Sequence, residues 1–226
     1  MSLQVTVVNV FVDEAGEHGN PLGILWSSKA TRGREQEIAR DVGFSETIFI
    51  DAVSEHDAHA RIFTPARELR FAGHPTVGLA SWLRASGDDI RSLMVPAGRV
   101  QVRAEGELIF VTAKPEWAPE FSFQQLESPA DVEGVDPDAY AFGNNYVWAW
   151  ADREQGRVRA RMFAPALGIR EDEATGSAAV RLTAQLDQDL DILQGAGSRL
   201  YTRTARADRE VEVGGRTSPE RIIELR

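Results

Sequence analysis

The feature that most constrains the fold is an internal repeat. Residues 61–81, "RIFTPARELRFAGHPTVGLAS", correspond to residues 161–184, "RMFAPALGIREDEATGSAAVRLTA". Both stretches begin Arg-x-Phe-x-Pro, continue through a charged loop and reach a glycine that opens a helix-like run. A repeated sequence unit predicts a repeated structural unit. We therefore expect an α/β (α+β) fold of two pseudo-symmetric domains, each a curved, mostly antiparallel sheet wrapped around a central helix.

The two helix-like runs differ in character. Residues 77–83 are apolar on nearly every side, and such a helix must be enclosed on all sides. The run 176–186 carries Arg181 and Gln185, which predicts one more exposed face. A third helix is expected over 31–43, with Thr31 as N-cap and Gly43 as the stop.

Strands are expected where β-branched and aromatic residues cluster between turn signals. The expected strands are 4–12, 23–26, 45–51, 59–64, 144–150, 157–165, 198–205, 209–213 and 221–225, with a hairpin over 99–113 that turns at Glu105-Gly106. Residues 114–143 are rich in Pro, Glu and Asp and are interpreted as an interdomain connection. The expected domains are 1–115 and 116–226, and a return of the last strand to the first domain stays open.

Composition narrows the classes of function. The 226 residues hold 25 Lys and Arg against 35 Asp and Glu, a net charge of −10. This balance argues against nucleic-acid and anionic-membrane partners, which need cationic surfaces. It leaves room for a small anionic substrate in a local pocket. No cysteine is present, so disulfides, thiolate metal sites and thiol nucleophiles are excluded. The amino terminus lacks signal-peptide features, and we expect a cytoplasmic protein.

Both repeats place a glycine and a small polar or heterocyclic residue at a helix start: Gly73 with His74, and Gly176 with Ser177. Free N–H groups and the helix dipole make such an end an anion site, worth ~0.3–1 kcal/mol when exposed. Two such ends facing each other would hold a carboxylate and stabilise enolate-like charge. A single glycine often only starts a helix, but the duplication favours the anion site.

Three titratable residues are candidates for the chemistry. Glu46 precedes the apolar run 48–50, which would raise its pKa toward the range of a general acid/base, although a solvated strand-end glutamate is the alternative. Asp172 lies four residues before Gly176 in an acidic run that also suits simple dipole complementarity. His74 is either a catalytic residue or a histidine hydrogen-bonded to a loop.

Two other chemistries are not supported. His56 and His59 have metal-like spacing, but they lie in a polar loop with no third ligand in view, so no metal site is expected. Ser177 has no adjacent base and no Gly-x-Ser-x-Gly setting, which argues against a serine hydrolase.

Five blocks of the sequence resemble the phenazine-biosynthesis isomerase family, the PhzF-like proteins. In chain order they are "NVFVDEAGEHGNPLGIL", "FSETIFI", "RIFTPARELRFAGHPTVG", "REDEATGSAA" and "LQGAGSRLY…VEVGG". The resemblance implies the diaminopimelate-epimerase-like fold, with the active site between two domains. It also implies a cofactor-independent isomerase, a small carboxylate substrate such as a dihydro-3-hydroxyanthranilate, and a homodimer. The residues it implies are Glu46 as the acid/base, His74, Asp172 and Ser177 lining the site, and Gly73, Gly176 and Thr175 around the substrate carboxylate.

The chain departs from this family pattern at several points. Arg70 and Glu173 stand where the family usually has proline, which puts substrate preference in doubt. The chain is shorter than typical members, and we place the shortening within 114–143, where a loop over the site would be lost. Diaminopimelate epimerases use two thiols at the positions of His74 and Ser177, so their thiol-based mechanism is excluded here.

The sequence thus predicts an isomerase that moves a proton between carbons through Glu46. Two alternatives remain at this stage. One is a non-catalytic carboxylate-binding protein of the same fold, and the other is a cysteine-independent epimerase that uses Glu46 and Asp172 as opposing bases.

Overall fold

The repeat in the sequence becomes a repeat of strand pairings. The computed structural model describes residues 3–165, 169–205 and 209–225. Within them, sixteen strands form one continuous, strongly curved sheet in the order β16-β1-β2-β3-β4-β6-β7-β8-β15-β14-β13-β11-β10-β9, with β5 and β12 added on β4 and β11. The first-repeat elements are β1 (Leu3–Val12), β2 (Asn20–Trp26), α1 (Glu35–Val42), β3 (Glu46–Val53), β4 (Asp57–Phe63), β5 (Glu68–Leu69), α2 (Gly73–Ala85), β6 (Ser92–Val95), β7 (Gly98–Glu105) and β8 (Leu108–Ala113).

The second repeat follows the same plan. Its elements are η1 (Pro115–Trp117), β9 (Ser122–Gln125), α3 (Pro129–Glu133), η2 (Pro137–Ala139), β10 (Asn145–Asp152), β11 (Arg157–Ala164), β12 (Ile169–Asp172), α4 (Gly176–Leu186), β13 (Leu190–Gln194), β14 (Ser198–Thr204) and β15 (Val211–Thr217), and β16 (Arg221–Leu225) closes the chain. The series β2-β3-β4-β6-β7 pairs parallel, antiparallel, parallel, antiparallel, and β9-β10-β11-β13-β14 repeats that series.

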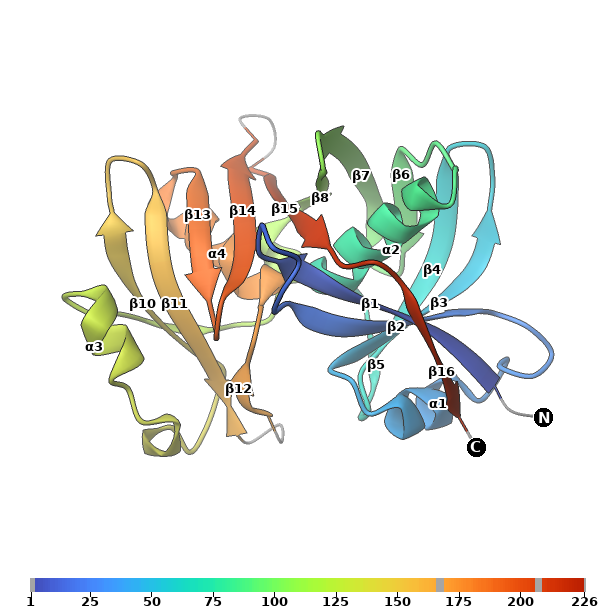
Figure 1. The fold of residues 1–226 in the computed structure, drawn as a ribbon, viewed down its shortest axis with the longest axis horizontal. Helices are drawn as coiled ribbons and strands as arrows, with labels where there is room; N and C mark the ends of the chain where they lie inside the picture. The colour runs from blue at the N-terminus through green and yellow to red at the C-terminus, as the bar shows by residue number, and fades with distance from the viewer. Residues whose placement is uncertain (1–2, 166–168, 206–208, 226) are drawn as a thin grey trace.

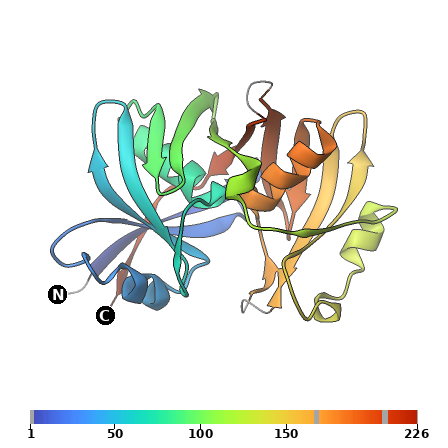
Figure 2. The same cartoon turned by 180° about the vertical axis from the view of Figure 1, so that it is seen from behind.

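Each repeat wraps its sheet around one helix, which confirms the predicted fold class (Figures 1 and 2). Helix α2 packs against β1, β2, β3, β8 and β15, and Val77, Leu79 and Ala80 on it are fully buried. Helix α4 keeps Arg181 partly exposed and Gln185 exposed, as their sequence positions predict. The apolar helix is therefore the enclosed one.

The two halves of the sheet, one in each repeat, differ in whether they close on themselves, and β1 makes the difference. This strand pairs with β2 on one side and with β15 on the other, so the half that belongs to the first repeat closes around α2. Among the described residues, the second repeat has no strand in the corresponding place, and its sheet ends at β9. Instead, the η1 segment packs on α4, where the Arg181 guanidinium donates to the carbonyl of Ala118 at 2.8 Å.

Several sequence expectations need correction. Helix α1 begins after Arg34 rather than at Thr31, whose hydroxyl donates to the Trp26 carbonyl within a turn; Gly43 does end the helix, with φ of 73°. Segment 114–143 is not a simple connection, because it contains β9 and α3, the counterparts of β2 and α1. The expected strands missed β5, β6, β9, β12 and β13, which have two to five residues each. The boundary between 115 and 116 stays a prediction, and β16 pairs with β1 of the first repeat.

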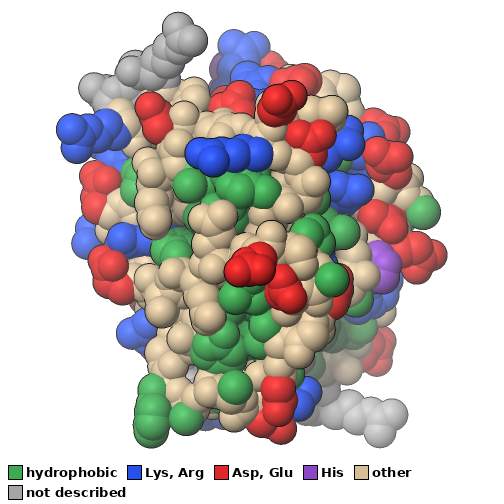
Figure 3. Space-filling model, turned by 90° about the vertical axis from the view of Figure 1, so that its left-hand side faces the viewer, with side chains coloured by type: hydrophobic (Ala, Val, Ile, Leu, Met, Phe, Trp, Pro, Cys, Tyr) green, Lys and Arg blue, Asp and Glu red, His purple; other side chains and the backbone are tan. Residues whose placement is uncertain are grey.

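Short helices cover the outer faces of the sheet. Helix α1 packs over β3 and β4, and α3 packs over β10 and β11 around a small core that includes Val132 and Phe163. Figure 3 views the end of the molecule formed by the second repeat, where hydrophobic side chains reach the surface between charged ones. Phe142, just before β10, is 84% exposed. None of the helices in the described ranges has the length and apolarity needed to cross a membrane.

Candidate active site

The two repeated helix starts meet in backbone contact at the centre of the molecule. A Cβ placed on Gly73 would lie 3.3 Å from Cα of Gly176, and a Cβ on Gly176 would lie 3.2 Å from the backbone nitrogen of His74. A Cβ at either position would crowd the other helix, so glycine favours this close approach of the two helix starts. The amino-terminal N–H groups of α2 and α4 are therefore gathered in one place, as the duplicated motif predicted.

A carboxylate and an imidazole lie beside this junction. Glu46 is the first residue of β3, and its side chain is 19% exposed; His74 in α2 is 4% exposed. His74 Nδ1 and Glu46 Oε2 are 3.0 Å apart. An ionised carboxylate can only accept, so Nδ1 carries the hydrogen and donates it. His74 Nε2 is buried and has no hydrogen-bond partner among the described residues.

The pKa of Glu46 differs from the sequence expectation. Burial raises this pKa, as the apolar neighbours 48–50 suggested, but the hydrogen bond and charge of His74, together with the Ser45 side chain, outweigh burial and leave the pKa below its ordinary value. The prediction of a raised pKa was therefore wrong, because the sequence did not show that His74 would donate to this carboxylate. Glu46 is therefore held as an ionised carboxylate at neutral pH.

Asp172, the last residue of β12, supplies a second carboxylate with the opposite perturbation. Asn20 Nδ2 donates to its Oδ1 at 2.7 Å, and the Thr175 hydroxyl donates to its Oδ2 at 2.5 Å. Burial, followed by the negative charge of Glu46, raises the pKa of Asp172 to about 6 in spite of these donors. The two carboxylates thus differ in proton affinity, which is the pattern expected of an acid and a base in one site.

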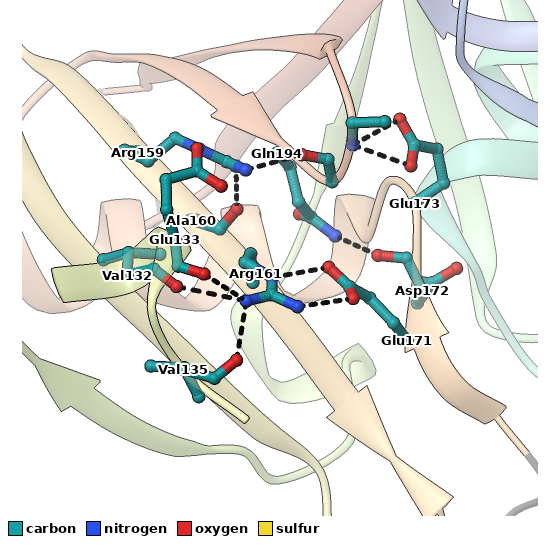
Figure 4. A network of polar contacts seen from close by, with 12 residues as sticks. Val132, Glu133, Val135, Arg159, Ala160, Arg161, Glu171, Asp172, Glu173 and Gln194 are labelled. Carbon is teal, nitrogen blue, oxygen red and sulfur yellow. Dashed lines mark hydrogen bonds and ion pairs between the residues drawn. The ribbon is translucent and has the colours of Figure 1, made fainter. Parts of the chain in front are cut away.

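The residues on either side of Asp172 are clamped by different elements (Figure 4). Arg161 of β11 makes two hydrogen bonds to Glu171, at 2.7 and 2.8 Å, and also donates to the Val135 carbonyl at 2.8 Å. Glu173 accepts from the Ala196 N–H at 2.9 Å. The acidic run is therefore a set of three separately bound side chains, and its central member turns to the site.

These residues line one small cavity of about 220 Å³. The central cavity is lined by Glu46, Ala72, Gly73, His74, Asp172, Ala174, Thr175, Gly176 and Ser177. All seven residues predicted for the site are in this set, from both repeats. Their roles in binding or catalysis stay predictions.

The two departures from the family pattern lie outside this lining. Arg70 is exposed, and the Glu173 carboxylate is turned to the β13–β14 turn. Among the residues that the structure describes, no group of three or more His, Cys, Asp or Glu is arranged to hold a metal ion.

Comparison with known proteins identifies the family of this chain. The family model described as phenazine biosynthesis-like protein matches residues 8–114 and 116–217. The chain belongs to this family. The isomerase resemblance drawn from the five sequence blocks is thereby confirmed.

The most informative relative is the trans-2,3-dihydro-3-hydroxyanthranilate isomerase of Pseudomonas aeruginosa, 32% identical over 263 aligned positions that cover 92% of this chain and 94% of the relative. The corresponding isomerase of Pseudomonas chlororaphis is 32% identical over 253 positions, covering 87% and 90%. Both alignments are longer than this chain, which has 226 residues, so the relatives carry insertions relative to it. The chain is an enzyme of this isomerase family.

Solved structures show the same fold. A putative PhzC/PhzF protein from Clostridium difficile superposes with a TM-score of 0.76 at 18% identity, covering 99% of each chain. A hydroxyproline epimerase from Agrobacterium vitis superposes with a TM-score of 0.61 at 14% identity, covering 99% of this chain and 93% of that one. At these identities the likeness concerns the fold alone.

The sequence interpretation missed two residues that hold the site. Asn20 and Gln194 are 7% and 0% exposed, and both bond to residue 172. Both lie in blocks that carry the family resemblance, "GNP" and "LQGAGS". Their amides bond to a segment more than twenty residues away, which no local pattern reveals.

Proposed function

We propose that the protein is a cofactor-independent isomerase that moves a proton between two carbons of a small carboxylate-bearing substrate. The substrate class is amino-acid-like or dihydro-3-hydroxyanthranilate-like, by analogy with the isomerases named above. One observation carries the proposal: two carboxylates from different repeats share the central cavity, with their pKa values displaced in opposite directions. Such a pair offers a base that is ionised at neutral pH and a second carboxyl that takes up a proton near pH 6.

Glu46 is the proposed base. Its ionised carboxylate takes a proton from one carbon of the substrate, and the electron pair of the broken C–H bond is delocalised over the substrate. The same proton, or one exchanged with solvent, then returns from Glu46 to a second carbon. The double bond moves, the proton count is unchanged and no redox partner is needed. His74 orients the carboxylate through the 3.0 Å hydrogen bond.

The helix starts are the proposed binding group for the substrate carboxylate. The backbones at Gly73 and Gly176 are in contact, which brings the positive ends of two helix dipoles together; these favour an anion and the negative charge that develops on proton removal. Ser177 and Thr175 line the same wall. Asp172, with a pKa of about 6, is the proposed donor or acceptor for a second proton on a substrate heteroatom.

Solvent-proton exchange tests the proposal. Wild type and Glu46→Gln are incubated in D₂O with a panel of small carboxylates that includes trans-2,3-dihydro-3-hydroxyanthranilate, and deuterium incorporation is followed by NMR. Glu37→Gln, on an exposed glutamate of α1, is the matched control. We expect Glu46→Gln to lose about 10²–10⁴-fold in rate and the control to keep the wild-type rate. Binding of a carboxylate without exchange by wild type would favour a binding protein instead.

A second candidate is a cysteine-independent epimerase. It is favoured by the placement of Glu46 and Asp172 on different repeats around one cavity, which suits two bases on opposite sides of a carbon. This candidate predicts inversion of a stereocentre, which chiral chromatography of the same incubations detects. A double-bond shift without inversion contradicts it.

The remaining expectations from the sequence stay predictions. They are the homodimer, the cytoplasmic location and the lack of nucleic-acid or membrane partners. Gel filtration with light scattering tests the first of them directly.

A further inference from the structure

Gln194, the last residue of β13, is fully buried and bonds to the backbone of Asp172 (Figure 4). Its Nε2 donates to the Asp172 carbonyl at 2.9 Å and to the Thr175 hydroxyl oxygen at 2.8 Å. Its Oε1 accepts from the Thr175 N–H at 3.2 Å and from the Tyr146 hydroxyl at 3.1 Å. Every polar atom of this amide is therefore used.

The backbone determines which way the amide of Gln194 points. The carbonyl of Asp172 can only accept and the N–H of Thr175 can only donate, so nitrogen and oxygen of the amide cannot be exchanged. A flipped amide would place an N–H against an N–H and an oxygen against an oxygen. The orientation thus follows from two fixed groups and does not depend on any rotatable hydroxyl.

This orientation also fixes the direction of the Thr175 hydroxyl. Because its oxygen already accepts from Gln194, its hydrogen is left for Asp172 Oδ2, 2.5 Å away. Asn20 supplies the corresponding donor to Oδ1 at 2.7 Å. Each oxygen of the carboxylate thus has one protein donor, and Asp172 still lines the cavity.

We propose that Gln194 is the positioning residue of the site: it pins the backbone of Asp172 and holds the Thr175 hydroxyl as a donor to the Asp172 carboxylate. Gln194 does not line the central cavity, so it acts through Thr175 and Asp172 rather than on the substrate. The role of Asp172 in turnover rests on the proposed function, whereas its titration does not.

The charged and titratable groups that act on Asp172 are few. Glu46 on β3 raises its pKa, and His74 on α2 lowers it. The hydroxyl of Tyr146 on β10 stays protonated, because burial raises its pKa far above the ordinary value. Gln194 itself does not titrate. A change in Asp172 titration on replacing Gln194 therefore reports on hydrogen bonding and hydration, provided that Glu46 and His74 are untouched.

The experiment measures the pKa of Asp172 by ¹³C NMR of aspartate carboxyl groups in the full chain, with the signal assigned by Asp172→Asn. The variants are Gln194→Leu, Thr175→Val and the double variant. Thr183→Val is the control for general loosening, since Thr183 on α4 forms a buried hydrogen bond to Thr202 away from the cavity. Thermal unfolding is recorded for each to show that the titration is made on folded protein.

The sign of the shift separates positioning from loosening. Losing a donor to the ionised form raises a carboxyl pKa, whereas admitting water to a buried carboxyl lowers it. We expect Gln194→Leu and Thr175→Val each to raise the pKa of Asp172 by about one unit, and the double variant to match Thr175→Val alone. Thr183→Val should leave it unchanged. A downward or absent shift in Gln194→Leu, or a full further shift in the double variant, overturns the proposal.

Turnover gives a second measurement. In the D₂O exchange assay, misplacement of Asp172 in Gln194→Leu should lower kcat about ten- to a hundred-fold with little change in KM. If wild type itself exchanges no proton with any substrate, the proposed function fails while the NMR titration still decides the role of Gln194.

Discussion

Replacing Asp172 by asparagine should make the free energy of unfolding less dependent on pH while impairing the enzyme. Burial and the charge of Glu46 raise the pKa of Asp172 to about 6, whereas an aspartate in the unfolded chain has a pKa of about 3.9. The folded state therefore holds this proton more tightly than the unfolded state does. The stability that the protonated group provides is fully present below pH ~4 and is lost as pH rises through 6.

The size of the effect follows from the two pKa values. A difference of about two units corresponds to about 3 kcal/mol of unfolding free energy, all of it lost at pH 8. At pH 5 about half has been lost. The amide side chain of the Asp172→Asn variant never ionises, so its unfolding free energy should rise relative to that of wild type by about 1.5 kcal/mol between pH 5 and pH 8.

Urea unfolding of both proteins at pH 5, 6, 7 and 8 measures this difference in unfolding free energy. Asp88→Asn, on an exposed aspartate after α2, is the control, and its unfolding free energy should differ from that of wild type by the same amount at each pH. The same samples should show a proton-exchange rate reduced about 10²-fold in Asp172→Asn. A difference in unfolding free energy that does not change with pH would refute the argument that burial raises this pKa.

Three further predictions concern the groups around the cavity. His74→Phe removes the donor that lowers the pKa of Glu46, so burial prevails and the pKa of Glu46 rises. Because the proposed base acts only when ionised, the acidic limb of the pH profile of proton exchange should move to higher pH. An acidic limb that stays in place contradicts this prediction. Gly176→Ala puts a Cβ 3.2 Å from the backbone nitrogen of His74. The unfolding free energy measured in urea should fall by about 1–3 kcal/mol and the proton-exchange rate should fall with it. An unchanged free energy and rate would show that the two helix starts can move apart without cost. Arg161→Met removes the guanidinium that makes two hydrogen bonds to Glu171. Because both side chains are largely buried, thermal unfolding should show that the folded state loses about 2–3 kcal/mol of stability, less than the roughly 3–5 kcal/mol lost when a fully buried pair is broken. Unchanged stability would mean that other contacts hold β12 in place.

The elements that were predictable from the sequence are those with strong local signals. Helix α4 begins at Gly176 and ends at Leu186 as predicted, because apolar periodicity and a glycine start are local properties. The hairpin of β7 and β8 turns at Gly106, which has φ of 59°. In contrast, β9 is a four-residue strand of exposed and half-buried residues within an acidic segment, and only its pairing with β10 makes it a strand.

The site divides in the same way. The glycine at each helix start indicated where two parts of the chain could come close together. That signal and the family resemblance predicted that Glu46, His74, Asp172 and Ser177 belong to one site, and all four line the central cavity. The pKa of Glu46 was predicted in the wrong direction, since the partner that decides it stands 28 residues away. Asn20 and Gln194 were missed for the same reason: amide side chains satisfy distant groups, and neither carries a charge or a motif of its own.

By itself, the sequence determined the duplicated α/β plan, the position of the two helix starts and the residue types available for proton transfer, because periodicity, glycine and cysteine content are properties of short stretches. Only the tertiary structure decided which carboxylate has a lowered pKa and which has a raised one. Those properties depend on burial and on hydrogen bonds across the two repeats, where His74 donates to Glu46, and Asn20 and Thr175 to Asp172. Proton affinity is set by the sum of these non-local contacts, and the sum exists only once the chain has folded.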